Sequence, residues 1–364
     1  MKKKSKKPTS LDVAKAAGVS QSTVSMILSN AKYASFSEET RQKVYKACIT
    51  TGYRGIAHKT ETNNEKILMT VCPSCENLDY LKAVKVIQQR CSEYGYGNFT
   101  LFSQRDPNTE NGIPQMLQTL PVEGVIFLYQ PENLWLLSKI SDIKPTISVF
   151  DRNSVISLDA IELNSQKIGK VIATHLIELG HERIAYVAID VNNKYMSRVK
   201  RLVGIKETYR KNGYDPEECI TLCTYSTEGL ESSSDLTEYE AGFVLANRII
   251  DKYEVTAFVG NNDMICLGIL DALQRRKSKV PQDYSVCGCD NIALSNHKAI
   301  SLTTVENYTH LRAGEAVDVL IKKMKQHSSD KPWEETPISM VKIEYEPRLV
   351  VRASTGPARL KKLF

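Results

Sequence analysis

Four side chains, all small, polar or flexible, share what the spacing predicts to be the outer face of a short helix over residues 21–28. They are Gln21, Ser22, Ser25 and Met26. Glutamine can pair with two atoms of an adenine edge, and methionine offers only apolar contact, for example to a thymine methyl. A helical hairpin that packs on a neighbouring domain is the alternative that the residues leave open. The chemistry that this face favours is the reading of base edges in DNA.

A second set of side chains lies where apolar runs end. Cys72, Asp151, Asn262 and Asp290 each end or directly follow a run that predicts a buried strand. In parallel α/β sheets, ligands bind outside the carboxyl ends of the strands. These side chains are therefore candidates for a ligand site in a cleft between two sheets.

Two further residues, Ser197 and Arg201, lie one helical turn apart and share a face with each other. Arg201 is a fixed fork of donors, Asp290 is a bidentate acceptor, and Asn262 is both donor and acceptor. Such a set can bind a hydroxyl-rich ring. The alternative is that these residues cap strand ends and stabilise loops, and Asn262 is equally suited to cap a helix. The aromatic side chains available to stack on a ring are Tyr80, Phe150 and Tyr225.

The elements that must position the first set begin with a short helix after Thr9. Val13, Ala14 and Ala17 have the spacing of one helix face. Thr9 and Asp12 are three residues apart, as in a capping box. The sequence therefore predicts a helix that starts after Thr9.

A turn and a second helix follow. Gly18 supplies the backbone freedom for the turn, and Ser20 can cap the next helix, in which Val24 and Ile27 face inward. Two short helices joined by such a turn form a helix-turn-helix. A third helix is predicted over residues 37–50, so that three helices share one small core.

Charge is distributed unevenly along the 364 residues. Residues 1–60 hold 12 lysines and arginines against 3 acidic residues, whereas the rest of the chain holds 36 against 39. A basic segment of this kind is the electrostatic footprint of DNA binding, since much of the affinity comes from phosphate neutralisation.

From residue 67 onward, apolar runs alternate with helical patterns. This alternation predicts parallel sheets covered by helices on both faces. The predicted strands are 67–71, 125–128, 146–150, 184–189, 257–259 and 285–287, and the predicted helices include 82–94 and 165–179. Residues 230–240 look like a loose polar insertion.

At this point the sequence resembles a known family. The stretches DVAKAAGVS-x-STVS, SEETRQKV and GYR closely resemble the DNA-binding head of the lactose/galactose repressor (LacI/GalR) family, and PVEGVIF, HLIELGHERIAYV, TAFVGNND and VPQDYSVCGCD follow in the family's order. The resemblance implies an α/β fold with an N-terminal helix-turn-helix head of three helices over 1–55. A hinge follows over 56–66. Residues 67–364 then form an effector-binding and dimerisation domain of two doubly wound parallel α/β subdomains of periplasmic-binding-protein type.

The family resemblance also implies a function and its residues. It implies a transcriptional regulator, expected to be a repressor, whose affinity for operator DNA is modulated by a small ligand, expected to be a sugar or sugar derivative. The residues expected to contact DNA are Thr9, Ser20, Gln21, Ser22, Thr23, Ser25, Met26, Asn30 and Tyr33. Those expected to contact the effector are Cys72, Tyr80, Phe150, Asp151, Ser197, Arg201, Tyr225, Asn262 and Asp290.

The hinge departs from the family pattern at two positions. Gly55 stands where the family has proline, and Thr62 stands where it has the leucine that wedges into the minor groove. Unstacking a base step needs an apolar wedge. The two departures therefore argue against the hinge-driven kink of the family.

Cysteine usage and the N-terminus bear on the compartment. Nine cysteines, an odd number, include the close pairs Cys72/Cys75 and Cys287/Cys289. A single Cys-x-x-Cys is a weak metal or redox signal, so we expect free thiols in a reducing cytoplasm and neither metal nor cofactor. No apolar run reaches the roughly 18 residues that span a bilayer, and no apolar stretch of a signal peptide follows the first lysines.

Competing functions are an α/β enzyme with an accessory helical domain and a sugar-binding protein for transport. No Gly-x-Gly-x-x-Gly, phosphate-binding loop or nucleophile elbow follows a predicted strand, so we expect no enzyme. The basic head argues against a transport protein. Because one helix-turn-helix reads only a few base pairs, we expect a symmetric homodimer on a pseudo-palindrome. No heptad-like leucine tail follows Val350, so we expect no tetramer.

Overall fold

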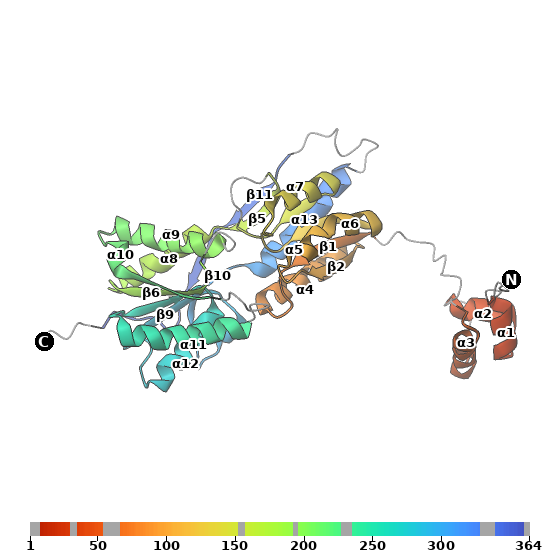
Figure 1. Cartoon of the computed structure of the whole chain (residues 1–364), viewed down its shortest axis with the longest axis horizontal. Helices are drawn as coiled ribbons and strands as arrows, with labels where there is room; N and C mark the ends of the chain where they lie inside the picture. The colour runs from red at the N-terminus through yellow and green to blue at the C-terminus, as the bar shows by residue number, and fades with distance from the viewer. Residues whose placement is uncertain are drawn as a thin grey trace. The chain divides into compact units, whose positions relative to one another are not determined.

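The computed structural model describes residues 8–29, 35–53, 66–151, 157–191, 196–226, 235–327 and 339–359. The chain divides into two compact units, residues 1–65 and 66–364, which we call the head and the body. Figure 1 shows the elements of each unit, coloured along the chain. Four positions that the sequence singled out lie outside the described residues: Asn30, Tyr33, Gly55 and Thr62.

Three helices form the head: α1 (Ser10–Ala17), α2 (Gln21–Leu28) and α3 (Glu38–Thr51). Thr9 and Asp12 make the predicted capping box, and Gly18 ends α1 with a left-handed φ of 68°. The helix-turn-helix and the third helix are thus confirmed. The buried core of the head consists of Val13, Ala14, Val24, Ile27, Val44 and Ala47.

The N-terminal half of the body is a six-stranded parallel sheet with the order β11-β5-β4-β3-β1-β2. Its strands are β1 (Ile67–Cys72), β2 (Gly97–Phe102), β3 (Val122–Phe127), β4 (Thr146–Ser148), β5 (Asp159–Leu163) and β11 (Lys342–Tyr345). Helices α4 (Leu78–Glu93) and α13 (Thr309–His327) cover one face, while α6 (Ile113–Thr119) and α7 (Leu134–Ile143) cover the other. The short helix α5 (Pro107–Asn111) precedes α6.

The C-terminal half repeats this architecture with the order β12-β10-β9-β8-β6-β7, and only β12 runs antiparallel to its neighbour β10. Its strands are β6 (Ile184–Ile189), β7 (Ile220–Tyr225), β8 (Ala257–Gly260), β9 (Ser285–Asp290), β10 (Thr303–Glu306) and β12 (Arg348–Val350). Helices α8 (Ser165–Glu178) and α9 (Met196–Lys211) pack on one face, and α11 (Asp235–Lys252) and α12 (Asp263–Arg275) pack on the other (Figure 1). Two short elements complete it, α10 (Pro216–Cys219) and the 3₁₀ helix η2 (Ala293–Asn296).

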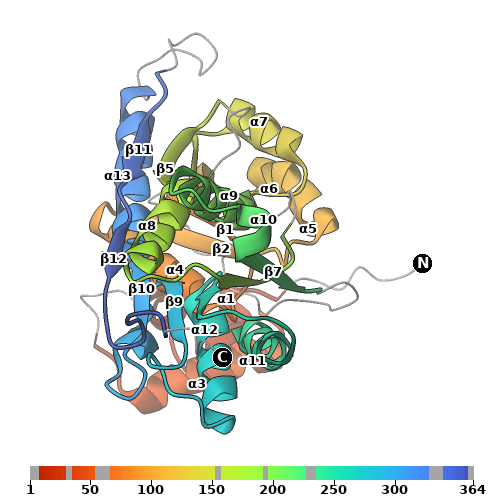
Figure 2. The same cartoon turned by 90° about the vertical axis from the view of Figure 1, so that its left-hand side faces the viewer.

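The chain passes between the two halves three times. It leaves the first sheet after β5 to form α8, returns after β10 to form α13, and passes from β11 directly to β12. Figure 2 shows β11 and β12 one after the other along the same edge of the body, beside α13. The two doubly wound parallel subdomains predicted from the sequence are therefore confirmed.

Two glycines bring α8 and α9 into close contact. A Cβ on Gly169 would overlap the carbonyl oxygen of Arg201, and a Cβ on Gly204 would overlap that of Gln166. Only glycine permits so close an approach of two helix backbones. This contact fixes where Arg201 lies relative to the start of α8.

Several strands escaped the sequence analysis for a physical reason. The edge strands β2 and β7 are only partly buried and alternate in exposure, so they lack the continuous apolar run that marks a central parallel strand. The prediction of a loose insertion is wrong over residues 235–240, which form the start of α11. Polar side chains of this first part of the helix find partners on α12, as described below.

All nine cysteines are free thiols, as predicted. Within the described ranges, no group of three or more histidine, cysteine or acidic side chains is arranged to hold a metal ion. None of the helices in the described part of the chain is long and apolar enough to cross a membrane.

Candidate functional site

The outer face of α2 carries the first set of candidate residues. Gln21, Ser22 and Ser25 are exposed and Met26 is half-buried, while Val24 and Ile27 point into the core. The four side chains singled out from the sequence therefore lie together on one helix face. Their placement suits contact with the edges of bases, because an α-helix fits the major groove of DNA.

Short hydrogen bonds hold the start of α2. The Ser20 hydroxyl accepts from the backbone N–H of Thr23 at 3.0 Å and lies 2.7 Å from the Ser22 hydroxyl. Gln21 reaches back to α1, where its Nε2 donates to Ser10 Oγ at 2.9 Å. No acidic residue lies in the first turn of α2, so no negative side chain there repels a phosphate that approaches the positive end of the helix. Thr9, the remaining described member of the DNA set, donates to Asp12 within the capping box of α1.

Asp151 joins the two halves of the body. It follows β4 in the N-terminal half, and its Oδ2 accepts from the backbone N–H of Ser165 at 2.9 Å. Its Oδ1 accepts from Lys200 Nζ on α9 at 2.7 Å. Ser165 and Lys200 belong to helices of the C-terminal half. The Asp151 carboxylate therefore makes one hydrogen bond and one ion pair with the other half of the body. We use "junction" for the place between the halves where Asp79, Asp151, Lys200, Arg201, Asp290 and Asn307 lie.

Arg201 is buried, with 6% of its surface exposed. Its Nη1 donates to the backbone carbonyl and to Oδ1 of Asn261, which follows β8. Tyr186 donates to the same Oδ1 at 2.9 Å. The Arg201 Nε, in contrast, is buried and has no hydrogen-bond acceptor among the described residues. A buried donor without an acceptor costs free energy, so this nitrogen is suited to an acceptor that a ligand supplies.

Asn262 and Asp263 have structural partners. Asn262 Oδ1 caps α12 by accepting from the backbone N–H of Ile265 at 3.0 Å, and its Nδ2 donates to Glu238 on α11 at 2.6 Å. Asp263 is fully buried and accepts from Ser295 and Thr304 at 2.6 Å each. Burial raises the pKa of Asp263 to about 6. The helix-cap interpretation of Asn262 thus describes its hydrogen bonds in this structure.

Asp290 ends β9 and is partly buried. Asn307 Nδ2 donates to Asp290 Oδ1 at 3.3 Å and to Asp79 Oδ2 at 2.9 Å. Burial raises the pKa of Asp290 well above its ordinary value, and the nearby Asp79 carboxylate raises it further. Burial of Arg312, which faces both acids, lowers the pKa of that guanidinium.

The remaining effector candidates lie in more apolar surroundings. Cys72 is fully buried in the core under α4, where burial raises the pKa of its thiol to about 11. Phe150 is 8% exposed and packs in the core under α6 and α7. Tyr80 on α4 and Tyr225 at the end of β7 are partly buried and pack on the edges of their cores, and Ser197 is partly buried on α9.

Sequence reasoning missed several polar residues that the fold brings to this region. Arg198 is 8% exposed and donates to the carbonyls of Ile189 and Asp190, with its guanidinium 3.7 Å from Glu238. Asp79 and Asn307 lie 228 residues apart in the chain and nevertheless share a hydrogen bond. Neither the start of α4 nor the segment after β10 carries a sequence motif that predicts this contact.

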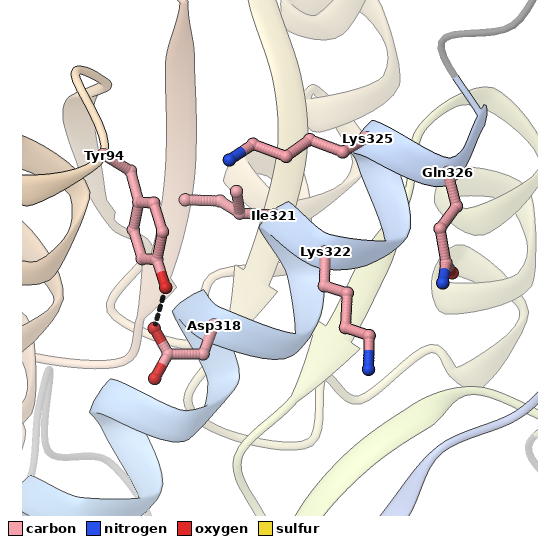
Figure 3. Close-up of a pocket in the computed structure, with 6 residues that line it drawn as sticks. All are labelled: Tyr94, Asp318, Ile321, Lys322, Lys325 and Gln326. Atoms are coloured by element: carbon pink, nitrogen blue, oxygen red, sulfur yellow. Dashed lines mark hydrogen bonds between the residues drawn. The ribbon is translucent and has the colours of Figure 1, made fainter.

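A hollow of about 510 Å³ opens elsewhere, on the surface of the N-terminal half. It is lined by Tyr94 and by a face of α13 (Figure 3). Tyr94 donates to Asp318 at 2.9 Å, and Arg90 binds the same carboxylate through two nitrogens at 2.7 and 2.9 Å. None of the effector candidates lines this hollow. Despite its volume, the hollow is therefore not part of the candidate site at the junction.

Comparisons with known proteins agree with this division of the chain. Residues 9–55, which include the three helices of the head, match the family described as bacterial regulatory proteins, lacI family. Residues 173–355 match the periplasmic binding protein-like domain.

Relatives match along nearly the whole length. The HTH-type transcriptional regulator DegA of Bacillus subtilis is 28% identical over 96% of this chain and 99% of its own. The HTH-type transcriptional repressor PurR of Haemophilus influenzae is 26% identical over 94% of this chain and 97% of its own. A LacI family transcriptional regulator from Enterococcus faecium, solved with bound ribose, has a TM-score of 0.67 at 18% identity and covers 81% of this chain and 100% of its own.

The head, the pair of doubly wound sheets and the matched relatives lead to one assignment. The relatives are transcriptional regulators, and the fold of the body is that of a ligand-binding domain of periplasmic-binding-protein type. This chain belongs to the LacI family of DNA-binding transcriptional regulators.

Proposed function

We propose that a small ligand, a sugar or sugar derivative, binds at the junction of the two halves and changes the affinity of the head for operator DNA. The observation that carries this proposal is the buried Nε of Arg201, which lacks an acceptor among the described residues. A ligand hydroxyl would complete its hydrogen bonding. The bound ribose of the Enterococcus faecium relative supports the choice of ligand class.

The ligand acts on DNA binding only if it prefers one arrangement of the two halves. Acceptors and donors reach the junction from both halves: Asp79 and Asp151 from the first, Lys200, Arg201 and Asp290 from the second. A ligand bound between them would therefore stabilise one arrangement over another. Coupling free energies of this kind are about 1–3 kcal/mol, which corresponds to a change of about 5- to 150-fold in operator affinity.

The proposal includes the assembly and the direction of regulation. The protein acts in the cytoplasm as a homodimeric repressor on a pseudo-palindromic operator, with no catalytic step. Two heads on one palindrome bind adjacent half-sites, as two-fold symmetry requires. The repressor activity named for the Haemophilus influenzae relative supports this direction.

The test is an operator titration with and without ligand. A panel of mono- and disaccharides that includes D-ribose is first screened by thermal shift of the full-length protein, and the best binder is then added to the titration. We expect wild type to respond and Arg201→Lys, which lacks the guanidinium fork, to bind operator without responding.

Arg210→Ala is the matched control, because Arg210 is exposed on the same helix. It should respond as wild type does. An equal response of wild type and Arg201→Lys would place the effector site elsewhere. Sedimentation of the protein as a monomer at micromolar concentration, with heads bound one at a time, would refute the dimer.

A further inference from the structure

Two carboxylates from opposite halves of the body share one amide. Asn307 Nδ2 donates to Asp79 Oδ2 at 2.9 Å and to Asp290 Oδ1 at 3.3 Å. Asp79 lies in the first turn of α4 in the N-terminal half, and Asp290 ends β9 in the C-terminal half. Asn307 itself lies in the segment that crosses from β10 to α13. The three side chains therefore span the junction at one of its crossovers.

The orientation of the amide is fixed by its other atom. Asn307 Oδ1 accepts from the backbone N–H of Thr309 at 3.0 Å, and the backbone carbonyl of Asn307 accepts from Arg312 Nε at 2.8 Å. The Thr309 hydroxyl lies 2.7 Å from both Asp79 Oδ2 and Asn307 Oδ1. With the amide oxygen held at the start of α13, the amide nitrogen can only point at the two acids.

The backbone on both sides of this contact is strained. Asp290 has a φ of 113°, Asn291 a φ of 49° and Tyr308 a φ of 54°. Non-glycine residues in such conformations cost about 1–3 kcal/mol each and persist only where the surrounding structure holds them. The strain lies within two residues of each end of the Asn307–Asp290 hydrogen bond.

Charges from five helices face Asp290. Asp263 on α12 and Glu238 on α11 add negative charge, as Asp79 does, whereas Arg201 on α9 supplies positive charge. Arg312 on α13 faces both Asp79 and Asp290. A carboxylic acid in a partly buried place next to a second carboxylate ionises only at a cost in free energy, and this applies to Asp290 beside Asp79.

We propose that Asn307 is a positioning residue that clasps the two halves of the body by holding Asp79 and Asp290 on one amide, and that Asp290, held beside the Asp79 carboxylate, carries a proton while clasped. The proton comes from solvent when the halves come together and returns to solvent when they separate. The arrangement of the halves is then linked to pH. A ligand that binds at the junction meets an acid pair that can both accept and donate a hydrogen bond.

Thermal unfolding of the full-length protein between pH 5 and pH 8 tests the clasp. An acid whose folded pKa is raised, as for Asp290, favours the folded state at low pH, and this contribution is lost as pH rises through the folded pKa. Asp79→Asn removes the charge that opposes ionisation of Asp290 and keeps the acceptor for Asn307. We therefore expect the melting temperature of Asp79→Asn, relative to wild type, to rise by a few degrees from pH 5 to pH 8.

Three further proteins make the test decisive. The double variant Asp79→Asn/Asp290→Asn should also gain melting temperature relative to wild type from pH 5 to pH 8, by at least as much as Asp79→Asn, because Asp290 can no longer ionise. Asn307→Asp places a third carboxylate at the clasp and should steepen the loss of stability with pH. Asp142→Asn, at an exposed position on α7, should follow wild type at every pH. Superimposable pH profiles of wild type, Asp79→Asn and Asn307→Asp would overturn the proposal. No ligand or DNA enters these measurements, so their outcome is independent of the proposed function.

Discussion

The outer face of α2 and the junction of the body differ in the exposure of their polar side chains and in the partners of their hydrogen bonds. On α2 the side chains are exposed and their hydrogen bonds are local, as between Gln21 and Ser10. At the junction they are buried or partly buried and bonded to one another, as between Asp151 and Lys200 or between Arg201 and Asn261. One region presents side chains to a partner, and the other holds them in a network.

This difference separates binding from stability. A substitution on an exposed helix face changes the free energy of unfolding by only about 0.5 kcal/mol in most proteins, whereas breaking a buried polar network is among the few causes of large losses. Variants on the exposed face of α2 should therefore affect DNA binding alone. Variants of the junction should affect both ligand response and folding.

The largest effect is expected for Asp263→Ala, at the buried edge of the junction network. The substitution leaves three donors without their acceptor: the hydroxyls of Ser295 and Thr304 and the backbone N–H of Ile292. Each buried group left unpaired costs about 1–3 kcal/mol. Chemical denaturation should show that the body loses several kcal/mol of its free energy of unfolding.

Asp263→Asn serves as the control, because it keeps one acceptor oxygen and the volume of the side chain. It should lose less than Asp263→Ala. If alanine costs no more than about 0.5 kcal/mol, the value typical of an exposed position, the contrast between the two regions fails.

The fold could be predicted from the sequence where burial leaves a pattern. The central strands β1, β3, β6 and β8 are nearly continuous apolar runs, and the head has capped helices of regular period. The start of α11 could not be predicted in this way. Glu238 and Tyr239 lie in a polar stretch that looks like a loop, yet in the structure they are helical, and their side chains bond to Asn262, the N-cap of α12, and to Asp271 on α12.

The sequence singles out only the local part of the candidate site. Asp151, Asn262 and Asp290 were singled out because each follows an apolar run, and Gln21 because it lies on an amphipathic helix. Asp79 and Asn307 were missed because their hydrogen bond forms where the chain crosses between the two halves. A contact between residues so far apart in the chain leaves no local periodicity in the sequence. The sequence also gave no sign that Arg201 is already bonded to Asn261.

A smaller effect, in DNA binding rather than stability, is expected for Gln21→Ala. Loss of a bidentate contact to one base should weaken binding to the cognate operator by about 1–3 kcal/mol and relax the preference at one base pair. Titration of a set of operators with single base substitutions measures both. The melting temperature of the protein should stay that of wild type.

Gln42→Ala is the matched control for Gln21→Ala, because Gln42 is an exposed glutamine on α3 of the same head. It should retain the base preference of wild type. A uniform loss of affinity across all operators with Gln21→Ala would instead identify Gln21 as a phosphate contact or a folding residue, and the exposed face of α2 would lose its role in specificity.

The smallest effect concerns the pH dependence of stability. It distinguishes the body from the three helices of the head, because residues 1–57 contain no histidine. In the body, His181 is buried and its ring lies 2.8 Å from Thr256 Oγ1, 2.9 Å from Ser285 Oγ and 3.0 Å from the carbonyl of Gly356. Burial lowers the pKa of His181 below its ordinary value. As pH falls through about 6.5, the unfolded chain takes up a proton that the folded body resists, so the stabilisation that His181 provides is lost.

His181→Gln isolates this contribution from the opposite trend of the buried acids. The variant should be less stable than wild type at pH 8, and the difference should shrink as pH falls to 5. His297→Gln, at an exposed position, should show a constant difference. Hydrogen exchange measured peptide by peptide should place the change in residues 66–364 and leave α1, α2 and α3 unaffected. A deficit of His181→Gln that stays constant from pH 8 to pH 5 would mean that the folded body accommodates the protonated ring as readily as the unfolded chain does.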